Sequence, residues 1–258
     1  EQGIKVPEYT EFTLGDIERA MEFLRTMNGP IVVKPARGTA GGDGVTTNVR
    51  TPRDLKRAAI FASLYTHTML AERQIPGTSY RLLYLNGGLL DAIRRKSPSV
   101  VGDGASTIRE LLHRENTRRA SMEGSEGLTW LRIDVDCRNT LASAGLSLDT
   151  VPATGAEVVV KQAANDNSSR ENESVTQLLC RELVQEGARA AEILGVQLAG
   201  VDLITTDPGK PLEETDGVIN EVNTTPGLHY HYQISNAAQG VPVIVPILKH
   251  LLALNGQD

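Results

Sequence analysis

The stretch IVVKPARGTAGGDGVTTNV, residues 31–49, decides the fold, because it joins two β-branched runs through a loop rich in glycine. The runs 31–35 and 45–49 predict two strands. The loop offers no helix start, so it fits neither a Walker-type phosphate loop nor a dinucleotide fingerprint, both of which lead into a helix. Its glycines would let backbone N–H groups approach phosphate oxygens from beside Lys34. We expect a hairpin flap over a nucleotide; the alternative is a flexible turn without a ligand.

The flanking sequence extends this unit into two α+β lobes. A capping box at Thr13 and a cap at Thr51 predict helices over 14–27 and about 52–64, followed by a strand over 68–75. We place the first lobe at 1–78 and the second at 79–258. The second lobe is expected to contain a hairpin, a helix starting near Ser174, two further strands and a final helix, listed as 80–85 with 89–95, 174–195, 198–205 with 217–223, and 242–254. Residues of about 97–156 follow a weaker pattern, with one helix capped by Thr107, and are expected to form an insertion.

Composition excludes several classes of protein. With 258 residues, 40% hydrophobic and 22% charged, the chain is expected to be a soluble globular protein. The net charge of −6, without a basic stripe, gives no support for nucleic-acid binding, and no apolar run predicts a membrane span. Cys137 and Cys180 lie far apart and have no metal-ligand spacing, which is compatible with a cytoplasmic location.

Acidic and amide side chains recur on two of the predicted strands. Glu221 and Asn223 are two residues apart, so they point to one face of a strand. Asp202 joins them if its strand pairs antiparallel across the turn near residue 211. Three hard oxygen donors on one surface predict a magnesium site. The alternative is a set of ordinary solvated residues, but Asp202 interrupts an apolar run, 199–204, where a carboxylate needs a partner or a metal.

The ordered set of these motifs resembles the ATP-grasp superfamily, and within it the cyanophycin synthetases and the ligase domain of bifunctional glutathione synthetases. The matching stretches span most of the chain: 32–35 with the glycine loop, 72–77 with 80–81, Arg95 with 100–111, 200–202 with 210–212, and 221–228. The resemblance implies an α+β ATP-grasp fold, in which two lobes with antiparallel sheets grip the nucleotide between them.

The resemblance also implies roles for individual residues on the nucleotide side. Lys34 would contact the adenine or the α-phosphate, and Glu72 the adenine amino group or the hinge region. The remaining nucleotide-binding candidates are Gly38, Thr39, Gly41, Gly42, Gly44 and Ile75.

On the catalytic side, Asp202, Glu221 and Asn223 would hold two Mg²⁺ ions, with Mn²⁺ as the alternative metal. Lys161 would contact the γ-phosphate and Arg95 the transferring phosphoryl group. Candidates for substrate contact are Arg81, Arg94 and His231. The alternatives are a surface ion pair for each arginine and a structural role for the histidine.

The implied activity is ATP-dependent joining of a carboxylate to an amine through an acyl phosphate, with release of ADP and phosphate. The substrates would be small molecules or peptides; a homo-oligomer is left open, and further domains are expected in a longer parent chain. Two departures favour an alternative, a regulatory ATP-binding domain without turnover. Asp43 replaces a basic flap residue, and only Lys5 precedes the first helix, so the upstream segment that carries a phosphate-binding lysine is expected to be missing. The other alternative is a stand-alone dipeptide or glutathione-type ligase.

Overall fold

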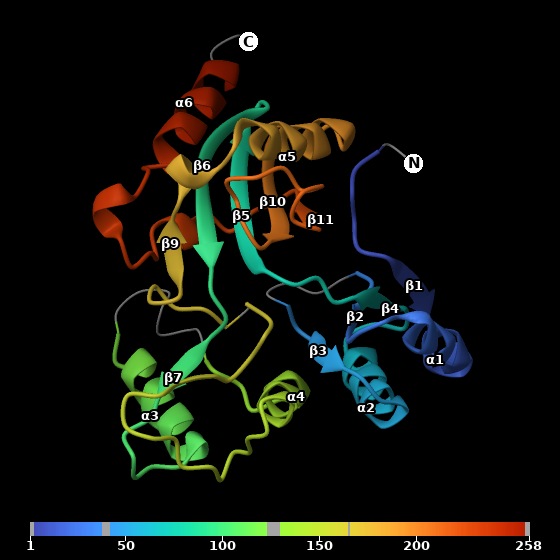
Figure 1. Ribbon diagram of the computed structural model, residues 1–258. Coiled ribbons are helices and arrows are strands. Elements are labelled where there is room, and N and C mark those ends of the chain that lie inside the picture. The colour runs from blue at the N-terminus through green and yellow to red at the C-terminus, as the bar shows by residue number, and fades with distance from the viewer. Residues whose placement is uncertain (1–2, 38–41, 123–129, 165, 256–258) are drawn as a thin grey trace. The chain divides into compact units, whose positions relative to one another are not determined.

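The computed structural model describes residues 3–37, 42–122, 130–164 and 166–255, in two compact units (Figure 1). One unit consists of residues 7–74 and 97–167, and the other of residues 1–6, 75–96 and 168–258. The grouping places 97–167, which includes the predicted insertion, together with 7–74. The division into functional lobes at residue 78 stays a prediction.

The unit of residues 7–74 and 97–167 contains the predicted strands around the glycine loop. Its sheet has the order β1-β4-β2-β3, all antiparallel, with β1 (Tyr9–Phe12), β2 (Ile31–Pro35), β3 (Thr46–Val49) and β4 (Met69–Arg73). The helices α1 (Ile17–Thr26) and α2 (Pro52–Ser63) bury one apolar face each against this sheet. Both predicted caps are confirmed: Thr13 forms a capping box with Asp16, ahead of the short 3-10 helix η1 (Leu14–Asp16), and Thr51 accepts the Asp54 N–H at 3.2 Å.

The second part of this unit builds a smaller core around a two-stranded sheet. In it, β7 (Ser99–Val101) pairs antiparallel with β8 (Glu157–Val159), and the helices are α3 (Ile108–Ala120) and α4 (Val135–Ser143). The capping box of Thr107 and Glu110 is confirmed at the start of α3. Ile108, Leu112 and Cys137 are fully or almost fully buried in this core, which holds both helices against the sheet. Each such buried aliphatic side chain contributes roughly 1.5–3 kcal/mol.

The other unit is built on a five-stranded antiparallel sheet of order β11-β10-β5-β6-β9. The strands are β5 (Thr78–Leu85), β6 (Gly88–Arg95), β9 (Asn172–Ser174), β10 (Leu198–Thr205) and β11 (Val218–Asn223). The helix α5 (Arg181–Ile193) packs across one face of this sheet (Figure 1). Leu82, Val201 and Leu203 of the sheet share a buried core with its apolar side. Because successive side chains alternate, Arg81 and Asp202 project from the opposite face.

That opposite face is covered in part by the final helix. At one end of the sheet, α6 (Ile244–Asn255) buries Ile247 with Val243 and Leu83. Short 3-10 helices complete the unit, η3 (Thr176–Leu178), η4 (Leu228–His231) and η5 (Ala237–Gln239). Within the described residues no helix has the length and apolar character needed to cross a membrane.

The predicted start of the long helix near Ser174 is wrong. Ser174 belongs to β9, where it pairs with Ile93, and the helix begins at Arg181 with Cys180 as its cap. The Ser174 hydroxyl donates instead to Asp91 at 2.9 Å. Pairing with a distant strand thus prevails over a local capping pattern. The predicted end is confirmed, since Gly195 follows the helix with a φ of 65°.

Candidate active site

The strands β10 and β11 bring the predicted metal ligands to one surface. Asp202 lies opposite Glu221, and Asn223 lies opposite Gly200, as the turn between the strands predicts. One extra residue, Asn220, forms a bulge that separates this pairing from the Leu203 pairing. Glu221 is exposed, whereas Asp202 is only 5% exposed. Two carboxylates and one amide therefore share the face opposite α5.

Arg81 forms a planar fork with Asp202 from the neighbouring strand β5. Its Nε donates to Oδ1 and its Nη2 to Oδ2, each at 2.6 Å, and both side chains are buried. Burial lowers the pKa of Arg81, but the charge of Asp202 and its hydrogen bonds outweigh burial and raise it above the ordinary value. The pair is thus a buried bidentate contact, different from the surface ion pair considered above.

Arg95 approaches the same carboxylate from β6. Its Nη1 lies 3.8 Å from Oδ2 of Asp202, and the residue is 8% exposed. Burial and the neighbouring Arg81 charge lower the pKa of Arg95, while Asp202 opposes that shift. The ring of Tyr230 lies 5.0 Å from Cζ of Arg95 and 5.6 Å from Cζ of Arg81. We call Arg81, Arg95, Asp202 and Tyr230 the floor cluster.

The donor set beside the floor cluster fits magnesium. Magnesium prefers one or two carboxylates, supplemented by water and substrate phosphates. Asn223 donates its amide N–H to the Gly200 carbonyl at 3.3 Å, so its Oδ1 is the atom with ligand character. Among the described residues, three or more His, Cys, Asp and Glu side chains nowhere gather as a metal site. The Arg81 fork uses one lone pair on each Asp202 oxygen, and a carboxylate oxygen has a second.

The other two substrate candidates lie apart from the floor cluster. Arg94 precedes Arg95 on the strand, so it projects from the opposite face, where its Nε donates to Glu173 at 2.8 Å. His231 is fully buried and its Nδ1 lies 2.7 Å from Oδ2 of Asp91. The structure thus brings together Arg81 and Arg95 but places Arg94 and His231 in other contacts.

The nucleotide candidates belong mostly to the four-stranded sheet. Nζ of Lys34 on β2 lies 2.7 Å from Oε2 of Glu72 on β4, so these two candidates meet. Ile75 belongs to the other unit and is buried. Of the flap glycines, Gly42 and Gly44 are described, while Gly38, Thr39 and Gly41 lie outside the described residues. Gly44 has a φ of 78°, and a Cβ there would lie 2.8 Å from the Pro35 ring, so the flap base requires glycine.

Lys161 lies in a second charged group, which includes the flap acid. Its Nζ is 2.7 Å from both Asp134 and Asp166, and the side chain is 1% exposed. Burial lowers the pKa of Lys161, but the two carboxylates raise it above the ordinary value. Arg132 donates to Asp166 at 2.9 Å and also pairs with the flap acid Asp43. We call Asp43, Arg132, Asp134, Lys161 and Asp166 the flap cluster.

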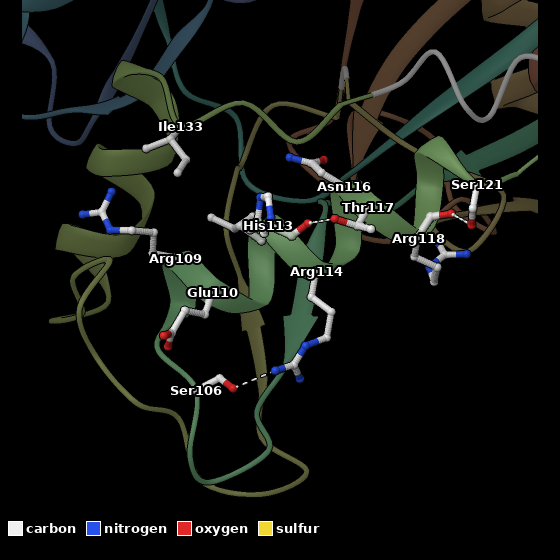
Figure 2. Close-up of a pocket in the computed structure, with 11 residues that line it drawn as sticks. Ser106, Arg109, Glu110, His113, Arg114, Asn116, Thr117, Arg118, Ser121 and Ile133 are labelled. Atoms are coloured by element: carbon white, nitrogen blue, oxygen red, sulfur yellow. Dashed lines mark hydrogen bonds between the residues drawn. The ribbon is translucent and has the colours of Figure 1, made fainter.

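A shallow groove follows α3 in the same unit (Figure 2). Three cations line it, and each has an acidic partner, at 3.3 Å for Arg109, 2.9 Å for Arg114 and 2.7 Å for Arg118. None of the predicted site residues is among the described residues that line the groove. The groove therefore adds nothing to the candidate site.

Sequence reasoning missed several residues of these groups: Arg132, Asp134 and Asp166 of the flap cluster, Tyr230 of the floor cluster, and Asp91, the partner of His231. Asp91 carries the same signal as Asp202, an acid within an apolar strand, and its carboxylate accepts hydrogen bonds from Ser174 and Thr176 besides facing His231. Arg132 and Tyr230 show no local signal, because their roles depend on partners far along the chain.

The comparisons with known proteins bear on the family and the fold. No family model matches the chain. It is 32% identical over 242 residues to cyanophycin synthetase of Trichormus variabilis, covering 93% of this chain and 26% of that protein. It is 30% identical over 240 residues to the glutathione biosynthesis bifunctional protein GshAB of Streptococcus mutans, covering 90% of this chain and 31% of that protein.

One solved structure supports the fold. The ATP-grasp ligase PsnB, in complex with minimal precursor, Mg and ADP, matches with a TM-score of 0.52 and 14% identity, over 97% of this chain and 54% of that one. Identity this low supports similarity of fold alone. The chain spans between about a quarter and a third of the length of the curated relatives quoted above.

Proposed function

We propose an ATP-dependent carboxylate–amine ligase activity for this chain. The chain is an ATP-grasp ligase domain similar to those of cyanophycin synthetase and GshAB. The observation that carries the proposal is the meeting of Asp202, Glu221, Arg81 and Arg95 on one face of an antiparallel sheet. Phosphoryl transfer depends mainly on positioning and on charge stabilisation, and this face supplies both.

The proposed reaction transfers the γ-phosphoryl group of ATP to a carboxylate, and an amine then displaces phosphate from the acyl phosphate. Asp202, Glu221 and Asn223 would hold magnesium, which supplies charge neutralisation at the phosphate oxygens. Arg95 would offer its guanidinium fork to the oxygens of the transferring group. Arg81 forms a buried fork with Asp202, which supports a role in holding that carboxylate in place. Lys34 and Glu72, which meet at 2.7 Å, would contact the nucleotide base or α-phosphate.

The geometry of Asp202 changes how the metal set is best tested. Asp202→Asn would leave the buried Arg81 without its partner, which costs about 3–5 kcal/mol of stability, so loss of binding would be ambiguous. Glu221→Gln is the sharper variant because Glu221 is exposed. Glu214→Gln, an exposed acid in the same unit, is the matched control.

Calorimetric titration of the chain with Mg-ATP then decides the metal assignment. We expect Glu221→Gln to weaken magnesium-dependent ATP affinity by roughly tenfold to a hundredfold, and Glu214→Gln to leave it within about twofold. Equal affinities for the two variants would overturn the metal assignment.

Nucleotide chromatography of reactions with the full-length parent protein tests the chemistry. ADP and inorganic phosphate are the expected products, since the cations surround the γ-phosphate in this proposal. AMP and pyrophosphate as the main products would point to adenylation instead.

The burial of Lys161 favours a second candidate, a domain that binds ATP without turnover. Its ammonium group is held by Asp134 and Asp166 and is 1% exposed, an arrangement that suits a structural cation. ATP binding without carboxylate-dependent ADP formation by the full-length protein would favour this candidate.

A further inference from the structure

Tyr230 lies over two guanidiniums that share one carboxylate. Its ring is 5.0 Å from Cζ of Arg95 and 5.6 Å from Cζ of Arg81, within the range of cation–π attraction. Both arginines are buried and both face Asp202. The negative face of the ring therefore offers a second attraction to cations whose hydration has been removed.

The residue after Tyr230 fixes the ring to the strand that carries Arg95. Nδ1 of His231 lies 2.7 Å from Oδ2 of Asp91, and both residues are completely buried. Oδ1 of Asp91 accepts from the hydroxyls of Ser174 and Thr176, at 2.9 and 2.8 Å. Because Asp91 and Arg95 are four residues apart on β6, they project from the same face, so η4 is attached to the face of β6 that carries Arg95.

The ring of Tyr230 also packs against the ring of His229, the preceding residue. The ring centroids of Tyr230 and His229 are 4.0 Å apart at an angle of 39°. A Cβ at Gly227 would lie 2.9 Å from His229 Cε1 and 3.1 Å from Tyr230 Cε2. A side chain at Gly227 would therefore require one or both of these rings to shift.

We infer that Tyr230 is a positioning residue that fixes the orientation of the Arg81 and Arg95 guanidiniums, with the Asp91–His231 pair as its anchor. The inference rests on the proposed function for its consequence in turnover. Tyr230 acts through the arginines. Both guanidiniums contact the face of its ring, and the hydroxyl takes no part in these contacts. Tyr230→Phe keeps the ring and Tyr230→Leu removes it, so these two variants form a matched pair.

The first test measures the motion of the two arginines directly, in the full 258-residue chain without ligand. Relaxation of ¹⁵Nε in Arg81 and Arg95 should show order parameters lower by about 0.2 in Tyr230→Leu, and unchanged in Tyr230→Phe. Equal order parameters in the two variants would overturn the inference. This readout does not depend on ligase activity.

The second test compares turnover in the full-length protein. Tyr230→Leu should lower kcat by roughly tenfold while KM for ATP stays within about threefold, and Tyr230→Phe should keep both values near those of wild type. A Leu variant as active as the Phe variant would contradict the inference. If wild type forms no ADP, the proposed function fails, and the relaxation measurement still decides whether Tyr230 positions the arginines.

Discussion

The floor cluster and the flap cluster both join basic and acidic side chains, but their balance of charge differs. In the floor cluster two guanidiniums face one carboxylate, on strands that hydrogen-bond to one another along their length. In the flap cluster two cations face three carboxylates, and all five residues lie outside helices and strands. A surplus of buried positive charge suits an incoming anion, whereas cations matched by carboxylates suit a structural role.

Removing Lys161 is the strongest test of a structural role for the flap cluster. Lys161→Met leaves Asp134 and Asp166 without the cation they share, so we expect a loss of about 3–5 kcal/mol in the free energy of unfolding. Urea unfolding measures the loss. The control is Arg109→Met, which removes a cation paired at an exposed site and should cost no more than about 1 kcal/mol. Similar small losses in both variants would show that the fold does not depend on Lys161. Lys161 would then again be a candidate for contact with the γ-phosphate.

Replacing Arg95 tests the floor cluster through turnover. Arg95→Lys keeps the charge but loses the fork, and we expect kcat to fall roughly a hundredfold to a thousandfold, or about 3–4 kcal/mol. Steady-state kinetics of the full-length protein measure the effect. Arg181→Lys, at the exposed start of α5, serves as the control and should leave kcat within about twofold. Near-normal turnover in Arg95→Lys would contradict a catalytic role for Arg95, and with it the proposed difference between a catalytic floor cluster and a structural flap cluster.

The pH dependence of stability separates Lys161 from other lysines. Its pKa is raised in the folded chain, because the attraction of Asp166 and Asp134 outweighs burial. The stabilisation is therefore complete below about pH 10, where ordinary lysines begin to titrate, and is lost as pH rises through the higher folded pKa. The stability difference between wild type and Lys161→Met should be constant from pH 7 to 9 and shrink above about pH 10. A difference that grows over that alkaline range would show that the sign is wrong.

Asp43 should show the smallest effect. Its pair with Arg132 is more than a third exposed on both sides, so Asp43→Asn is expected to change the free energy of unfolding by less than about 1 kcal/mol. The control is Glu11→Gln, at an exposed position. Asp54→Asn would not serve, because Asp54 accepts a hydrogen bond from Thr51 at the start of α2. A loss above about 2 kcal/mol would contradict this, and would mean that the pair of Asp43 with Arg132 stabilises the fold as strongly as a buried pair does.

The sequence predicted the parts of the fold that depend on local patterns. The capping box at Thr107, the hairpin at Asn86 and the register of Asp202 against Glu221 all follow from residues close together in the chain. The start of α5 was predicted wrongly because Ser174, which resembles a cap, pairs with a strand some 80 residues away. Local preference decides an element only where no distant partner competes for it.

The candidate site divides in the same way. The opposition of Asp202 and Glu221 could be predicted because a single turn joins their strands. The fork from Arg81 could not, since 121 residues separate it from Asp202. The same holds for His231 and Asp91, which are 140 residues apart. Such pairs need the sheet order, β11-β10-β5-β6, which no short pattern encodes.

Gly200 shows how the site constrains attempts to redesign it. It lies opposite Asn223 on β10, and a Cβ added there would be 2.8 Å from Cβ of Pro226 and 3.5 Å from Cδ of Arg81. A proline ring cannot swing aside as the end of a flexible side chain can. In a library that randomises this face, position 200 should therefore return glycine alone, and the productive diversity should come from the exposed positions Thr224 and Thr225, which are outside the proposed metal set.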